Sequence, residues 1–199
     1  MFGLGMRSSQ KRTLPAGLPV RASLRSVSAE QHRRAAPAVL GFATLTVSDT
    51  RSEGDDASGN AIRGLAAAAG HRVMDSTLVR DEVEEIRAAA RRLLALPGVD
   101  VLVTTGGTGF SPRDVTLEAV GPLLERPVEG FGELFRMLSH GQVGAAAMLS
   151  RAAAGLVGRE AGTQAVFLLP GSPKAVTLAM EALILPEAAH LLGQARRPG

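Results

Sequence analysis

The chain has 199 residues, 45% of them hydrophobic, and it contains no cysteine, tyrosine or tryptophan. This length and apolar content predict one buried core and leave too little chain for two full domains. The absence of cysteine excludes thiolate catalysis, cysteine zinc sites and disulfides, and it fits a cytoplasmic protein. No stretch approaches the roughly 18 uninterrupted apolar residues of a membrane span, so we expect a soluble protein. The four histidines are widely separated, which gives no support to a histidine metal site.

The positive charge is concentrated in residues 1–36. They carry seven Arg or Lys residues against Glu30, a net charge of +6, so residues 37–199 must carry −3 to reach the chain total of +3. No nucleic-acid partner is expected, because the rest of the chain has no basic excess and no tyrosine or tryptophan to stack on bases. The composition of residues 1–36 predicts disorder. An organelle transit peptide has a similar composition, but arginine is frequent throughout the chain, which favours a plain extension or a misassigned start site.

Residues 37–199 are expected to form a single domain in which strands alternate with helices. Apolar runs predict strands at 39–47, 71–79 and 99–104. Amphipathic stretches predict helices over 59–69, ended by Gly70, and over 82–96, ended by Pro97 and Gly98. This order predicts an α/β fold with a mostly parallel sheet, whose ligands bind at the carboxyl ends of the strands.

The segment 104–114, here called the glycine loop, leaves the carboxyl end of the third predicted strand. Its glycines allow backbone N–H groups to face an anion, and a helix start predicted near Pro112 would add partial positive charge. Glycines also form ordinary strand-to-helix turns, and SPRD (111–114) is a good helix cap, so both interpretations stay open on local evidence. The segment does not match the GxxxxGK[ST] or GxGxxG patterns, and GSP at 171–173 does not form a GxSxG motif.

A second candidate site follows the buried run at 165–169. Ser172 is predicted to cap a helix that has Pro173 at its first position. Lys174 then lies in the first turn, where it opposes the helix dipole, and a bound phosphate would remove that conflict. The more common alternative is a lysine that points into solvent.

Two carboxylates are predicted to lie near this edge of the sheet. Asp114 ends the glycine loop and Asp81 follows the second strand. Paired carboxylates beside bound phosphates suit Mg²⁺, which takes one or two carboxylates and completes its shell with water and phosphate oxygens. The alternative for Asp81 is an acidic first helical turn shared with the neighbouring glutamates.

The chain from about residue 39 to residue 192 resembles the molybdenum-cofactor biosynthesis proteins, in the group of protein B and molybdopterin adenylyltransferase. The resemblance rests on long, ordered motifs: TVSDTR (46–51), SG (58–59), TTGGTGFSPRDVT (104–116), EGFGELFRMLS (129–139), AMLSRAAAG (147–155) and LPGS (169–172). The forms EGFGELFRMLS and SRAAAG are more similar to protein B. Residues 1–36 lie outside the resemblance.

The resemblance implies a three-layer αβα domain that assembles into homo-oligomers, trimers or hexamers. It also implies transfer of AMP from ATP to the terminal phosphate of molybdopterin, with Mg²⁺ and release of pyrophosphate, and contact with the proteins that insert molybdenum. Asp81 and Asp114 match the two aspartates that support Mg²⁺ and the transfer. The matching segments place Thr105, Gly106, Gly107, Thr108, Gly109, Arg113 and Ser150 around molybdopterin and its phosphate, and Ser48, Asp49, Pro170, Gly171, Ser172 and Lys174 around the nucleotide.

Two functions remain open at this point. Positioning and charge neutralisation are enough for nucleotidyl transfer, so a protein without cysteine can catalyse it. Some relatives of protein B keep the fold and bind pathway intermediates or partners without catalysis. The carboxylate pair favours the enzyme. A module of a competence-damage-type protein is disfavoured, because the chain has no second catalytic domain.

Overall fold

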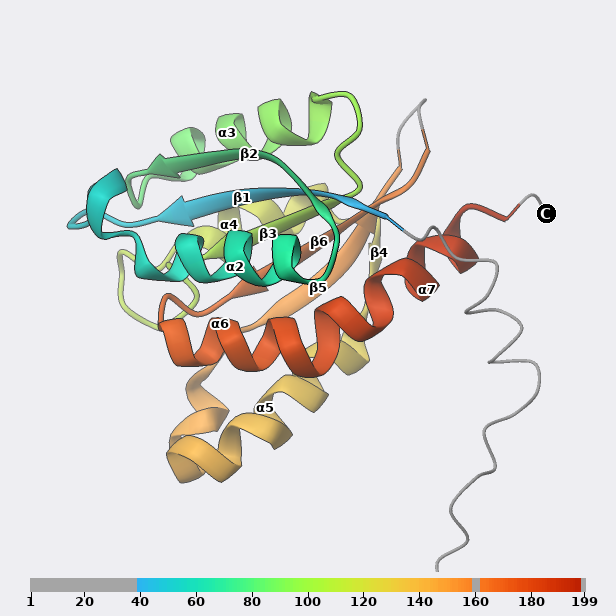
Figure 1. The fold of residues 1–199 in the computed structure, drawn as a ribbon. Coiled ribbons are helices and arrows are strands. Elements are labelled where there is room, and N and C mark those ends of the chain that lie inside the picture. The colour runs from blue at the N-terminus through green and yellow to red at the C-terminus, as the bar shows by residue number, and fades with distance from the viewer. Residues whose placement is uncertain (1–38, 159–161, 198–199) are drawn as a thin grey trace, which may run out of the picture.

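A six-stranded mixed sheet forms the centre of the protein (Figure 1). The computed structural model describes residues 39–158 and 162–197, so the disorder predicted for residues 1–36 lies outside the described residues. The sheet order is β2-β1-β3-β6-β5-β4. Its strands are β1 (Gly41–Val47), β2 (Arg72–Val79), β3 (Val101–Thr105), β4 (Arg126–Pro127), β5 (Ala153–Val157) and β6 (Gln164–Leu169). The pairs β1–β2, β1–β3 and β3–β6 are parallel, whereas β5 is antiparallel to both β6 and β4.

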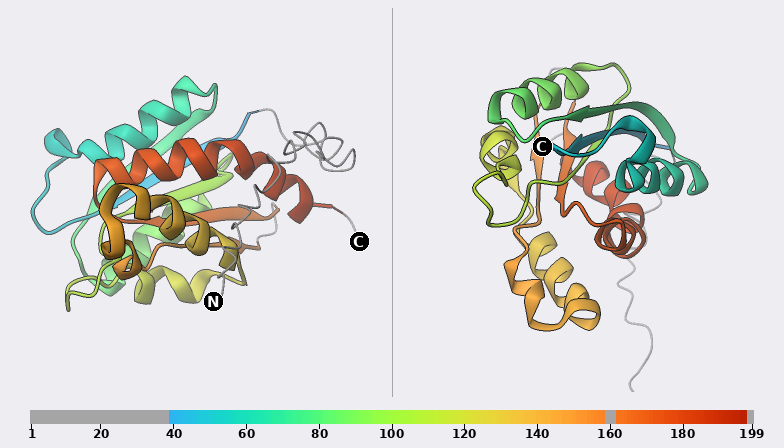
Figure 2. Two further views of the ribbon diagram at one scale, coloured as in Figure 1. Left: turned by 90° about the horizontal axis from the view of Figure 1, so that it is seen from below. Right: turned by 90° about the vertical axis from the view of Figure 1, so that its left-hand side faces the viewer.

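Helices cover both faces of the sheet, which confirms the α/β prediction (Figure 2). One face carries α2 (Ala57–Ala68), α5 (Glu129–Val143), α6 (Pro173–Ala179), a π-helical segment η4 (Met180–Ile184) and α7 (Leu185–Ala195). The other face carries α3 (Val83–Ala95) and α4 (Thr116–Val120). The short 3₁₀ helices are η1 (Glu53–Asp55), η2 (Gly121–Leu123) and η3 (Gly144–Leu149).

The central strands are buried because each is covered on both faces. Every residue of β1, β3 and β6 is buried, as expected for continuous apolar strands in a parallel sheet. β2 lies at the edge and is partly exposed. Alternate residues of β3 enter the two cores: Val101 and Val103 pack under α2 and α6, and Leu102 packs under α3.

The predicted ends of the first two helices are confirmed. Gly70 and Gly98, with φ angles of 82° and 79°, follow α2 and α3 in the left-handed conformation that glycine adopts without strain. α2 begins slightly earlier than predicted, because the Asp56 carboxylate caps it by accepting a hydrogen bond from the N–H of Gly59 at 2.9 Å. No elements were predicted between the helix expected near Pro112 and the buried run at 165–169, where the structure contains β4, α5 and β5.

The continuous helix Pro173–Ala195 is long and apolar enough to cross a membrane by length and composition alone. Its inward side chains, among them Val176, Met180, Ile184 and Leu192, belong to the core beneath the sheet. The apolar content of this helix is therefore accounted for by packing.

Candidate functional site

The loops that follow four parallel strands meet at one end of the sheet, where these strands have their carboxyl ends (Figure 1). These are residues 48–51 after β1, residues 80–82 after β2, the glycine loop after β3 and residues 170–172 after β6. The parallel pairing places the carboxyl ends of these strands together. The structure thus brings the two candidate sites of the sequence analysis to the same edge.

The glycine loop closely approaches the neighbouring strands. Gly106 and Gly107 have φ angles of 104° and 62°. A Cβ atom on Gly106 would lie 2.1 Å from the carbonyl oxygen of Val47. The N–H of Gly106 donates to the Leu169 carbonyl at 3.0 Å. Glycine at position 106 is therefore required both by the backbone conformation and by the contact with β1.

Two threonines on either side of the glycines hold the loop in place. The Thr116 hydroxyl donates to the Gly106 carbonyl at 2.8 Å, and the Thr116 N–H donates to the Gly107 carbonyl at 3.0 Å. The buried Thr105 hydroxyl donates to the Pro170 carbonyl at 2.9 Å. Thr105 therefore positions the loop against residues 170–172.

The helix predicted near Pro112 does not form there, and that prediction was wrong. Residues 111–114 make a turn in which the Asp114 N–H donates to the Ser111 carbonyl at 2.8 Å. The Asp114 carboxylate accepts the Ser111 N–H at 2.8 Å. Helix α4 begins only at Thr116, because the bonds from Thr116 to the glycine loop fix the chain direction up to that residue.

The two aspartates predicted to act together both lie against the glycine loop. A Cβ atom on Gly107 would lie 3.1 Å from Asp81 Oδ1, and a Cβ atom on Gly109 would lie 2.9 Å from Asp114 Oδ2. Asp49 joins them, since its carboxylate accepts the Asp81 N–H at 3.2 Å.

Arg113 bridges Asp49 and Glu82 beside this group of carboxylates. Its guanidinium donates to both carboxylate oxygens of Asp49, at 2.9 and 3.0 Å, and to Glu82 at 2.8 Å. The hydrogen bond from Arg113 lowers the pKa of Asp49. The pKa of Asp81 is raised, first by burial and then by the negative charge of Asp49. A cation beside Asp81 would relieve this repulsion.

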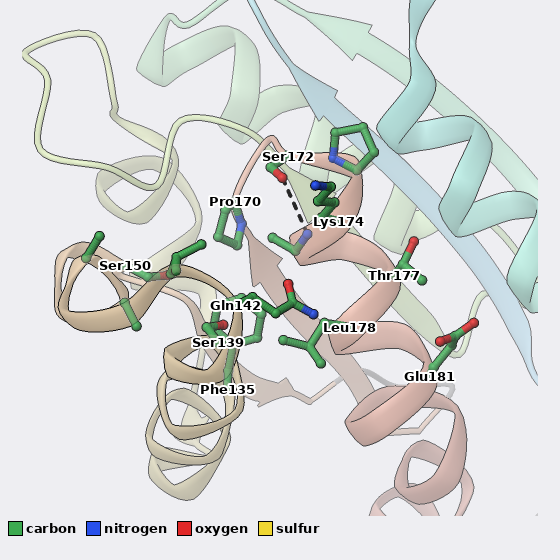
Figure 3. Close-up of a pocket in the computed structure, with 15 residues that line it drawn as sticks. Phe135, Ser139, Gln142, Ser150, Pro170, Ser172, Lys174, Thr177, Leu178 and Glu181 are labelled. Carbon is green, nitrogen blue, oxygen red and sulfur yellow. Dashed lines mark hydrogen bonds between the residues drawn. The ribbon is translucent and has the colours of Figure 1, made fainter.

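A cavity of about 900 Å³ opens between α5, η3 and α6 (Figure 3). Four of the predicted site residues line it: Ser150, Pro170, Ser172 and Lys174. The Ser172 hydroxyl caps α6 by accepting the Ala175 N–H at 3.4 Å, as predicted. Among the described residues, Lys174 forms no ion pair, and it lies in the first turn of α6.

The sequence pattern did not predict the rest of the cavity wall. α5 contributes side chains one helical turn apart, and the helix from α6 into η4 does the same: Phe135, Ser139, Gln142, Thr177, Leu178 and Glu181. Figure 3 shows Gln142 and Leu178 facing each other across the cleft. The helical spacing of these residues could indicate which share a face, but it could not show that the two faces oppose each other.

Backbone contacts join the cavity to the glycine loop. The Arg151 N–H donates to the Thr108 carbonyl at 3.3 Å. A Cβ atom on Gly171 would lie 3.3 Å from Gly106 Cα. The Gly171 carbonyl also accepts hydrogen bonds from Ser58 and Arg51, each at 2.7 Å. The glycine loop, the carboxylates and the cavity therefore form one continuous site.

Two other predicted residues hold the loops of this site. The Ser48 hydroxyl accepts the Arg51 N–H at 3.2 Å and so stabilises the turn after β1. The Ser150 hydroxyl accepts the Ala152 N–H at 3.3 Å, at the start of β5. Both side chains shape the backbone at the edge of the sheet.

Residues 43–190 match the family model described as "Probable molybdopterin binding domain". The chain is 44% identical over 172 residues to the molybdenum cofactor biosynthesis protein B of Bacillus cereus. The alignment covers 86% of this chain and 99% of that protein. A crystal structure of a molybdenum cofactor biosynthesis protein B superimposes with a TM-score of 0.76 at 45% identity, covering 82% of this chain and 99% of that one. The tungsten cofactor synthesizing protein MoaB from Pyrococcus furiosus has a TM-score of 0.75 at 37% identity, covering 81% of this chain and 100% of its own.

The family match includes every strand but the first residues of β1, and it spans the glycine loop, both aspartates and the cavity. The chain therefore belongs to the molybdopterin-binding family that includes the molybdenum cofactor biosynthesis proteins B.

Proposed function

We propose that the protein acts in molybdenum cofactor biosynthesis in the cytoplasm and catalyses the Mg²⁺- and ATP-dependent adenylylation of molybdopterin. The observation that carries the proposal is the glycine loop, which has Asp81 and Asp114 on its surface and adjoins a cavity of about 900 Å³. A cavity of this size suits a ligand as large as molybdopterin. Its wall combines apolar side chains with a lysine and the amino end of α6, which suit a flat ring system and a phosphate.

The reaction requires two phosphate groups to meet. An oxygen of the molybdopterin phosphate forms a bond to the α-phosphorus of ATP, and the bond from that phosphorus to pyrophosphate breaks. The glycine loop and Lys174 would hold the phosphates, and Thr105 and Thr116 keep the loop in place. Such a transfer depends on positioning and charge neutralisation, which these residues supply without a covalent intermediate.

Asp81 and Asp114 would hold Mg²⁺. Bound Mg²⁺ would neutralise the charge that develops on the phosphates. The carboxylates fit this ion, because the burial of Asp81 and its repulsion by Asp49 favour a nearby cation. No group of three or more His, Cys, Asp or Glu side chains suited to a metal occurs in residues 39–158 and 162–197. The ion would therefore take most of its ligands from phosphate and water, as Mg²⁺ commonly does.

The proposed function is tested by incubating the purified protein with molybdopterin, MgCl₂ and ATP. We expect adenylylated molybdopterin and pyrophosphate in equal amounts, and neither without Mg²⁺. If molybdopterin binds but no product forms, the protein is instead a non-catalytic molybdopterin-binding or scaffold protein of the same pathway.

We also propose that the protein is a homo-oligomer, a trimer or a hexamer. Residues of α5 and η3, here called the α5–η3 arm, project from the sheet (Figure 2) and expose large apolar side chains. These side chains, with their exposed fractions, are Leu134 (47%), Met137 (63%), Val143 (56%), Met148 (74%) and Leu149 (58%). A concentrated apolar surface of this kind is typical of a subunit interface. The same arm could contact molybdenum-insertion proteins.

The substitution Met148→Glu is expected to dissociate the oligomer, because it places a charge in an apolar interface. Sedimentation should then show a mass near the 20.6 kDa of one chain instead of a multiple of it. Val73→Glu is the control, since Val73 is 41% exposed on the distant edge strand β2. A wild-type protein that sediments as a monomer at micromolar concentration would contradict the proposal.

A further inference from the structure

Phe110 is an exposed aromatic ring at the glycine loop. Its side chain is 70% exposed. The other phenylalanines of the described chain, Phe42, Phe131, Phe135 and Phe167, are between 1% and 6% exposed and belong to the core. Burial of such a side chain favours folding, so folding alone does not explain the exposed position of Phe110.

The ring has a fixed support on one face. The guanidinium of Arg151 lies 5.4 Å from the ring centroid. Two other groups hold that guanidinium: the Glu118 carboxylate accepts from it at 2.6 Å, and the Asp114 carbonyl accepts from it at 2.7 Å. These bonds hold the Arg151 guanidinium in place, and its contact with one face of the Phe110 ring orients that ring.

The Phe110 ring is also close to the glycine loop and to the cavity. Phe110 directly follows Gly109, where an added Cβ atom would lie 2.9 Å from Asp114 Oδ2. The backbone of Arg151 is bonded to Thr108, and the preceding residue, Ser150, lines the cavity. A molecule with phosphates on the glycine loop and a flat ring attached to them could reach Phe110.

We infer that Phe110, supported by Arg151, is a stacking platform for the purine base of the nucleotide. This inference rests on the proposed function, because it assumes that the nucleotide phosphates lie at the glycine loop. The resemblance implies the reverse placement, with molybdopterin at the glycine loop and the nucleotide at residues 170–174. We assign the cavity of about 900 Å³ beside Lys174 to molybdopterin instead, because it is the larger space, and this leaves the loop tip to the base. Stacking on an aromatic face depends on the π surface of the ring and requires no hydrogen bond to the base, so Phe110 would contribute affinity to the base and none to the phosphates.

The test compares ATP with inorganic tripolyphosphate, which offers similar phosphates but no base. Binding of a non-hydrolysable ATP analogue and of tripolyphosphate is measured by calorimetry in the presence of Mg²⁺. For Phe110→Leu we expect the affinity for the ATP analogue to fall on the order of tenfold, while the affinity for tripolyphosphate stays the same. Phe110→Trp should restore or increase the affinity for the analogue. Val73→Ala, which shortens an exposed apolar side chain on β2, should change neither affinity.

Four other outcomes would reject the inference, and each identifies a different reason. Equal affinities of the wild type and Phe110→Leu for the analogue would reject the platform alone and leave the proposed function standing. A Phe110→Leu protein that binds a pterin about tenfold more weakly, with unchanged affinity for the ATP analogue, would assign the ring to molybdopterin and reject the purine. A smaller mass in sedimentation with unchanged binding would make Phe110 an interface residue. A wild type that binds neither the analogue nor tripolyphosphate would reject the proposed function together with the inference.

Discussion

Asp114→Asn is expected to reduce Mg²⁺-dependent adenylyl transfer by on the order of a hundredfold or more while the protein stays folded. The substitution removes a full negative charge beside the proposed Mg²⁺, and a hundredfold loss corresponds to about 2.7 kcal/mol of transition-state stabilisation. The fold should tolerate it, because the carboxamide oxygen of asparagine can still accept the Ser111 N–H that Asp114 accepts at 2.8 Å. Initial rates and thermal unfolding of the same preparation separate the two effects.

Asp81→Asn should cause a similar loss of activity with a different effect on stability. Because burial and Asp49 raise the pKa of Asp81 above 3.8, the folded protein disfavours the ionised carboxylate more than the unfolded chain does. Stability is therefore lost as the pH rises from 3.8 through the raised pKa, and the charged group lowers the stability at pH 7. Asparagine removes that charge, so the melting temperature without Mg²⁺ should be unchanged or higher at pH 7.

Glu85→Gln is the control for both variants. Glu85 lies in the first turn of α3 and is exposed, so the change removes a carboxylate charge without altering the site. It should leave activity within a factor of about two, since surface substitutions away from the core and the candidate site have small effects. If both aspartate variants keep near-normal turnover, Asp81 and Asp114 are not the metal ligands of the reaction.

Gly106→Ala is expected to destabilise the protein by about 3 kcal/mol or more, measured as the free energy of unfolding in urea. The added Cβ would lie 2.1 Å from the Val47 carbonyl oxygen, and the φ angle of 104° is one that alanine rarely adopts. Backbone strain at such a residue costs about 1–3 kcal/mol by itself, and the contact requires β1 or the loop to move. Activity should also be lost, because the loop can no longer lie against β1.

Gly64→Ala provides the matched control. Gly64 lies inside α2, and no atom lies within 4 Å of an added Cβ. The same change should therefore stabilise the protein by about 0.5–1 kcal/mol, because alanine loses less conformational freedom in a helix. Similar effects of the two substitutions on unfolding would show that the glycine loop does not hold its close contact with β1 in solution.

The sequence by itself determined the local structure and the chemical character of this protein. The apolar runs and the positions of Gly70 and Gly98 were sufficient for the first three strands and the ends of α2 and α3, because hydrophobic periodicity and glycine conformation act within a few residues. The parallel order also predicted that Asp81 and the glycine loop would lie at the same end of the sheet, since parallel strands share a direction. The pairing of β6 with β3, which brings Lys174 to that end, was shown only by the structure.

Tertiary structure alone decided where α4 begins, what Arg113 and Arg151 contact, and which helix faces form the cavity. The turn at Ser111–Asp114 replaced a well-capped helix start because Thr116 is bonded to Gly106 and Gly107, and these contacts outweigh a local capping preference. Phe135 and Gln142 face Leu178 only because α5 and α6 pack on the same side of the sheet. Such contacts join residues that are distant in the chain, so they depend on packing that no local pattern specifies.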